Sequence, residues 1–85
     1  MKIEDIDQFL LEQPITYESV RMDFVDGSFK VGFFENIVGD FDALRQKNHW
    51  RFIENNNSVA YRENNNNPVY TTMINGDNVN KLTVL

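Results

Sequence analysis

The amino-acid sequence predicts a mostly β domain, a small and strongly bent barrel of five strands preceded by an α-helix. Three observations carry this prediction. The first residues repeat apolar side chains at helical spacing, the later segments alternate apolar and polar side chains, and turn signals rich in glycine or asparagine separate those segments. Small barrels close through strongly bent strands, and a glycine inside one predicted strand is typical of such a bend.

Length and composition predict one domain over residues 1–85, with an N-terminal helix over residues 1–13 and the barrel over residues 17–85. Apolar residues make up 41% of the chain and aromatic residues 13%, which is sufficient for a globular core. A chain of 85 residues buries only a marginal core, however. The sequence has no cysteine to supply disulfides or thiolate metal ligands. The small core must therefore stabilise the chain alone or be extended by association with other chains.

The N-terminal segment predicts a helix because Ile3, Ile6 and Leu10 fall three and four residues apart. Acidic residues in its first turn suit the helix dipole, and Pro14 ends it because the residue before a proline avoids the α region. This acidic segment differs from a basic secretory signal, and no stretch approaches the roughly 20 apolar residues of a membrane span. The expected location is therefore cytoplasmic, without a membrane segment.

Residues 20–33 predict a β-hairpin, because apolar and polar side chains alternate along both halves. Asp26 and Gly27 are a strong signal for a two-residue turn of type I′, which needs positive φ at both positions. A register centred on this turn places Asp23 opposite Lys30 as a favourable charge pair. It also places three apolar pairs on the other face: Phe24 with Phe29, Met22 with Val31 and Val20 with Phe33.

The rest of the chain predicts a bend, a helical turn and further strands. Gly32 lies inside the second strand and predicts a bend or bulge, so we assign it, with Asp26 and Gly27, a structural role. Asp40 is a candidate cap for a short helical turn. Asparagine-rich turns separate the remaining segments. The predicted strands there are residues 49–53, 58–63, 69–74 and 79–85.

Two glycine-centred segments resemble the signatures of the Sm/Lsm family of small, SH3-like barrels. Residues 73–82 ("MINGDNVNKL") resemble the second signature, an apolar strand end followed by a short arginine-glycine turn, two polar residues and an apolar residue that opens the last strand. Residues 20–33 match the first signature in part, through the acidic-glycine turn and Gly32. The resemblance touches most of the chain and implies a five-stranded Sm-like or SH3-like barrel.

The resemblance also implies a ligand-binding site made of Asn48, Asn75 and Gly76. In the family, an acidic residue and an asparagine between the second and third strands bind an RNA base, on which the arginine of the second signature stacks. Asp40 or Asp42 is the corresponding acid here, without a matching spacing, and Asn75 replaces the arginine. The family fold is therefore expected to carry over more completely than its RNA site.

Other chemistry-bearing residues show no recognisable active-site pattern. His49 is the only histidine, and the sequence has no nucleophile-elbow motif to accompany it, so we interpret it as a structural residue of a strand. EF-hand, P-loop and dinucleotide-binding patterns are missing as well. We expect no enzymatic activity, no cofactor and no metal site.

The aromatic segment at residues 49–53 has two interpretations. Aromatic and arginine side chains that alternate can stack on nucleic-acid bases. Large aromatic residues also dominate small cores, and only one face of a strand can be core. We favour the second interpretation, with Trp50 and Phe52 inside and Arg51 and Ile53 outside.

Charge decides between two functional hypotheses. The net charge of −5 repels nucleic-acid backbones, and Asn75 lacks the positive charge of the family arginine. The sequence therefore favours a non-enzymatic, Sm-like module that binds a protein partner and acts as a homo-oligomer. In the family, the fourth strand of one subunit pairs with the fifth strand of the next. The alternative is an Sm-like protein that binds single-stranded RNA, which the two glycine-centred signatures favour.

Overall fold

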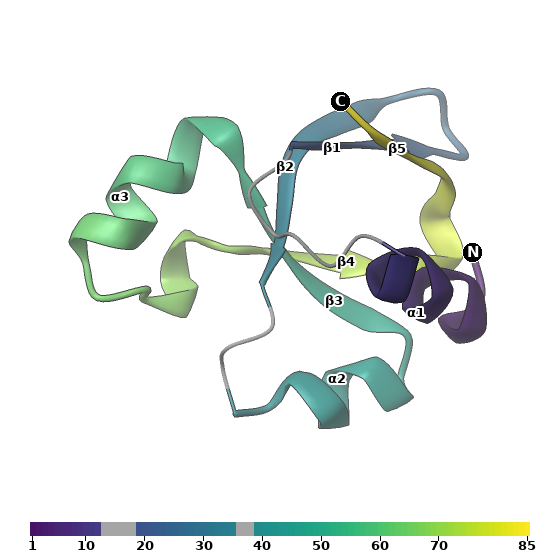
Figure 1. The fold of residues 1–85 in the computed structure, drawn as a ribbon, viewed down its shortest axis with the longest axis horizontal. Coiled ribbons are helices and arrows are strands. Elements are labelled where there is room, and N and C mark those ends of the chain that lie inside the picture. The colour runs from purple at the N-terminus through teal and green to yellow at the C-terminus, as the bar shows by residue number, and fades with distance from the viewer. Residues whose placement is uncertain (13–18, 36–38) are drawn as a thin grey trace.

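A computed structural model describes residues 1–12, 19–35 and 39–85 (Figure 1). Five strands form one antiparallel sheet in the order β4-β3-β2-β1-β5. The sheet is not closed, because no strand pairing joins its end strands β4 and β5 within the described residues. A mostly β architecture with an N-terminal helix is confirmed. The strands are β1 (Val20–Phe24), β2 (Phe29–Glu35), β3 (His49–Glu54), β4 (Thr72–Asn75) and β5 (Val79–Val84).

The helices connect and cover the strands. The N-terminal helix α1 (Ile3–Glu12) lies within the predicted span, while Pro14 and the predicted start of the barrel at residue 17 lie outside the described residues. None of the described helices is long and apolar enough to cross a membrane. The other helical elements are α2 (Phe41–Gln46), α3 (Ser58–Glu63) and the 3₁₀ turns η1 (Asn55–Asn57), η2 (Pro68–Tyr70) and η3 (Gly76–Asn78).

The predicted strand at residues 58–63 is wrong, because these residues form helix α3. Figure 1 shows α3 and α1 on opposite sides of the sheet. The side of β3 that was predicted to face solvent is therefore covered: α3 contacts β3, Ile53 is fully buried, and Tyr61 of α3 is buried too. The following prediction, a strand over residues 69–74, is only partly right, since η2 precedes β4.

The main core lies on the face of the sheet that α1 covers. Ile6 of α1 is fully buried together with Trp50 and Phe52 of β3, which confirms the inward orientation predicted for the two aromatic residues. Phe34 of β2 contacts both rings edge-to-face, with centroid separations of 6.2 Å to Trp50 and 5.4 Å to Phe52. Aromatic packing thus ties β2 to β3 at the centre of the sheet.

The hairpin of β1 and β2 forms as predicted, but its loop has three residues. The Phe24 N–H donates to the Ser28 carbonyl at 2.9 Å, which leaves Val25, Asp26 and Gly27 as the loop. The Gly27 N–H donates back to the Phe24 carbonyl at 3.0 Å, and Gly27 has a φ of +90°. This is a type I turn followed by a residue in the left-handed region. Asp26 does not adopt the positive φ that a type I′ turn requires.

The three-residue loop shifts the strand register by one residue, so the predicted pairings are wrong. Met22 lies opposite Lys30, whose ammonium group reaches the Glu54 carboxylate at 3.4 Å. A lysine fits on this inner face because its aliphatic stem packs while its charge reaches the rim. Asp23 pairs with Arg21 Nε at 3.0 Å. The pairs that do not form are Phe24 with Phe29, Met22 with Val31, Val20 with Phe33 and Asp23 with Lys30.

At Gly32, β2 and β3 approach too closely for a side chain on β2. A Cβ atom at this position would collide with the Ile53 carbonyl oxygen and lie 2.8 Å from the Ile53 carbonyl carbon and 2.9 Å from Glu54 Cα. These are backbone atoms of the neighbouring strand, which cannot rotate away as a side chain can. Gly32 therefore sets the separation of β2 and β3. Of the predicted bend or bulge, the bulge does not form, because the register of β2 with both neighbouring strands is continuous at Gly32.

Candidate functional site

The fold brings the three predicted ligand-binding residues together at one end of the sheet. Asn48 immediately precedes β3, with a φ of +59°, and its carbonyl oxygen accepts a hydrogen bond from the Gly76 N–H at 2.8 Å. Asn75 ends β4 and lies opposite His49. The pairing of β3 with β4 therefore joins residues that are almost thirty positions apart in the sequence.

The side chain of Asn48 is engaged within the chain. Its Oδ1 atom accepts a hydrogen bond from the Trp50 indole N–H at 2.8 Å. Its Nδ2 atom donates to the Met1 carbonyl at 2.9 Å and to Asp77 Oδ1 at 3.2 Å. Only 7% of the residue is exposed. Both amide hydrogens and the amide oxygen thus have partners, so the contacts of Asn48 are structural.

Gly76 and Asn75 complete the same network. A Cβ atom at Gly76 would lie 2.5 Å from Asn48 Cγ and 2.7 Å from Asn48 Nδ2, so a larger residue would displace the buried amide. Asn75 is exposed, and its side-chain oxygen accepts a hydrogen bond from the Asp77 N–H at 3.0 Å, which caps η3. Together the three residues fix the turn between β4 and β5.

The acidic residues considered as partners of Asn48 have other roles. Asp40 is the N-terminal cap residue of α2, although its side chain makes no capping hydrogen bond. Instead it accepts a hydrogen bond of 2.6 Å from Arg51 Nη2, and this guanidinium group holds the pKa of Asp40 below its usual value. Arg51 was predicted to point into solvent, yet only 18% of its side chain is exposed. Asp42 is exposed on α2.

Ion pairs link several elements of the fold. Among the described residues, four lysine and arginine side chains pair with carboxylates: one pair lies within β1, and the others join β2 to β3, α1 to α2, and the cap residue of α2 to β3. Each of these four cations therefore has a carboxylate beside it. The pairs are Arg21–Asp23, Lys30–Glu54, Arg45–Asp7 and Arg51–Asp40.

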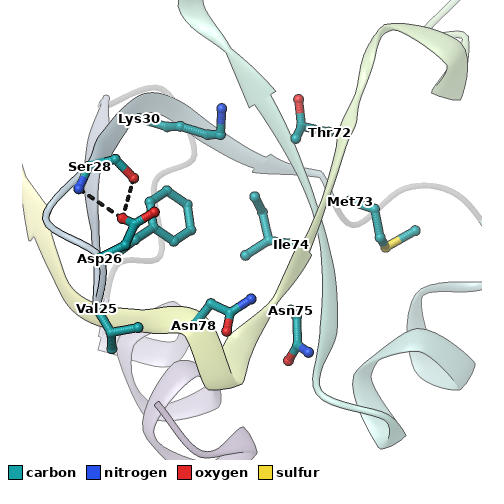
Figure 2. Close-up of a pocket in the computed structure, with 10 residues that line it drawn as sticks. Val25, Asp26, Ser28, Lys30, Thr72, Met73, Ile74, Asn75 and Asn78 are labelled. Atoms are coloured by element: carbon teal, nitrogen blue, oxygen red, sulfur yellow. Dashed lines mark hydrogen bonds between the residues drawn. The ribbon is translucent and has the colours of Figure 1, made fainter.

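A feature that the sequence analysis missed is a trough of about 430 Å³ between β4 and the hairpin (Figure 2). β4 forms one wall, and Asn78 closes one end. Ile74 points from β4 into the trough, whereas Met73 points away from it. The hairpin wall consists of Phe24, Val25, Asp26, Ser28 and Lys30. The trough could not be predicted because its walls lie more than forty residues apart and meet only through the order of the strands.

The outer edge of β4 adds backbone groups to this trough. Because the Gly76 N–H bonds to β3, the alternation of an antiparallel ladder directs the backbone groups of Ile74 and Thr72 toward β3 as well. The N–H and C=O groups of Met73 and Asn75 consequently point toward the open edge. In the part of the chain that the structure describes, no strand pairs with this edge.

A second buried polar cluster lies under α3. Glu35 is only 4% exposed and lies opposite Arg51 in the pairing of β2 with β3. Burial raises the pKa of the Tyr61 phenol, and the nearby Glu35 raises it further. Within the described ranges, no three His, Cys, Asp or Glu side chains are grouped to hold a metal ion.

Comparison with protein-family models, curated proteins and solved structures finds no match. Function must therefore be argued from the residues and contacts of this chain.

Proposed function

We propose that this chain is a non-enzymatic interaction module, built as an Sm-like or SH3-like barrel, that acts as a homo-oligomer. The observation that carries this proposal is the strand order β4-β3-β2-β1-β5, which places the last strand beside the first and leaves β4 and β5 at the two ends of the sheet. An unpaired edge is a template for a strand from another chain.

The end strands carry few of the features that usually block such pairing. β4 is only 4 residues long but contains neither a charged residue nor proline, and Lys81 is the only charged residue of β5. The two edges differ, so contact of β5 with β4 of the next copy is head-to-tail. Such contacts close into a ring when the rotation between successive subunits divides evenly into a full turn. The marginal core of an 85-residue chain supplies a reason for association.

The β5 edge offers a direct test. Since the Leu85 N–H bonds to Ser19 beside β1, the ladder alternation directs the N–H of Val84 away from β1. Val84→Pro should remove an intermolecular donor and release subunits, while Val84→Thr, which keeps the N–H, should not. Light scattering on both variants measures the mass. Equal masses for the two variants, with a folded circular dichroism spectrum, would show that this edge is not the contact.

RNA binding is the less favoured function. The side chain of Asn48 is occupied, Asn75 replaces the family arginine, and the net charge is −5. We expect binding of fluorescent oligo-U or oligo-A at physiological salt to be no tighter than about 10⁻⁶ M, the range of non-specific contacts. Tighter, saturable binding would favour RNA over a protein partner.

A further inference from the structure

We propose that the trough beside β4 is a docking site for an extended segment of a partner protein. The segment adds to the β4 edge as a further strand and carries an apolar residue and a lysine or arginine two positions apart. This inference rests on the proposed role as an interaction module, but its occupant is a segment of a different protein instead of a neighbouring copy.

The open edge of β4 offers backbone hydrogen-bonding groups to an incoming strand. Met73 and Asn75 direct their N–H and C=O groups toward the open edge, and both residues line the trough. Peptides that add to a sheet edge obtain their affinity from such main-chain hydrogen bonds. Met73 is 47% exposed and its side chain points away from the trough, so the opposite face of this edge is open as well.

The trough is placed to receive side chains of a strand that adds to this edge. Successive side chains of an added strand alternate between the two faces of the sheet, so every second side chain enters the trough. There it meets Ile74, whose side chain points inward, and Phe24 of the hairpin. A volume of about 430 Å³ accommodates more than one side chain of the incoming segment. An apolar residue at one of these positions packs against the half-buried Phe24, while Ile74, which is only 4% exposed, forms the floor beneath it.

The negative charge of Asp26 favours a partner segment with a basic side chain. Asp26 lies on the hairpin wall, where its carboxylate accepts hydrogen bonds from the Ser28 N–H at 2.9 Å and the Ser28 hydroxyl at 2.6 Å. These bonds lower the pKa of Asp26, so the group is an anion at neutral pH. Among the described residues that line the trough, the one cation is Lys30, which is paired with Glu54. A basic side chain at the second inward position complements this wall and the net charge of −5.

The proposed test uses a fluorescent threonine heptapeptide with leucine at its third position and lysine at its fifth. A matched peptide carries glutamate in place of the lysine. Fluorescence anisotropy with the full chain should show saturable binding of the lysine peptide at millimolar concentration and weaker binding of the glutamate peptide. Asp26→Asn keeps the oxygen that accepts from Ser28, and it should abolish this preference, a change of about two- to fivefold.

A backbone variant tests the added strand. Met73→Pro removes the N–H that points to the open edge, and we expect the lysine peptide to bind about three- to tenfold more weakly, the effect of one lost hydrogen bond. Met73→Thr loses the same side chain but keeps the N–H and should bind normally. Circular dichroism confirms that each variant is folded.

Three results of the binding assays would overturn the inference: no binding of either peptide by the folded protein, equal binding of both peptides, or equal binding by the two Met73 variants. The mass of the protein without peptide tests self-association separately. If copies associate through β4, the peptide competes for the same edge, so the lysine peptide should also lower the mass. If the Val84 variants show that β5 contacts β4 of the next copy, an oligomer whose mass is insensitive to saturating peptide would contradict docking at β4 and leave self-association standing.

Discussion

The separation of the two central strands should be the feature of the fold that is most sensitive to one added methyl group. In Gly32→Ala, the new Cβ would collide with the Ile53 carbonyl oxygen and lie 2.9 Å from Glu54 Cα. The strands must move apart, because both contacts are with backbone. We expect the loss of about two ladder hydrogen bonds, worth about 1–3 kcal/mol in total, and a further cost of about 1–3 kcal/mol from overpacking.

This combined cost of about 2–6 kcal/mol is a large part of the stability of a small domain, which is about 5–15 kcal/mol. Urea unfolding followed by circular dichroism measures it. Gly39→Ala is the matched control, because a Cβ at Gly39 would meet no atom of the described residues within 4 Å, and the stability of this variant should change little. If Gly32→Ala is as stable as Gly39→Ala, the close approach of β2 and β3 is wrong.

Three further substitutions probe local features by urea or thermal unfolding. Gly27→Val forces a β-branched residue to a φ of +90° and should cost about 1–3 kcal/mol; an unchanged midpoint would place the turn elsewhere. Asn48→Ala leaves the buried Trp50 indole N–H without its acceptor and should cost about 1–3 kcal/mol, whereas no loss would contradict the structural role of the amide. The pKa of the Tyr61 phenol is raised in the folded state, so above about pH 10 the phenol of the unfolded chain loses its proton first and the free energy of unfolding should fall as pH rises. Tyr61→Phe should flatten this fall. An unaltered pH profile in this variant would contradict the raised pKa.

Local signals predicted the parts of the fold that local physics determines. The spacing of Ile3 and Ile6 indicated a helix, and the Asp26-Gly27 pair indicated a hairpin, because each depends on residues that are close in sequence. The register was wrong by one residue because the same pair fits both a two-residue and a three-residue loop. Apolar pairing could not correct this error, since Lys30 occupies an inner position and reaches Glu54.

Long-range contacts decided the features that the sequence did not predict. Residues 58–63 are too few for helix propensity alone to dominate, and their helix is stabilised by contact with β3 and burial of Tyr61. Ile53 is buried for the same reason. At the candidate site, the signature segments indicated that Asn48, Asn75 and Gly76 matter. Sequence could not reveal that the Asn48 amide is already engaged, because its partners lie in three separate segments.

The most direct test of the central claim, that this chain is a self-associating interaction module, is its mass in solution. Light scattering across a dilution series in moderate salt should give a multiple of the 10.0 kDa chain mass at micromolar concentration. Moderate salt matters because several copies with a charge of −5 repel one another, and ions screen that repulsion. A particle of about 10 kDa at every concentration would contradict the claim and leave a monomer with two open edges.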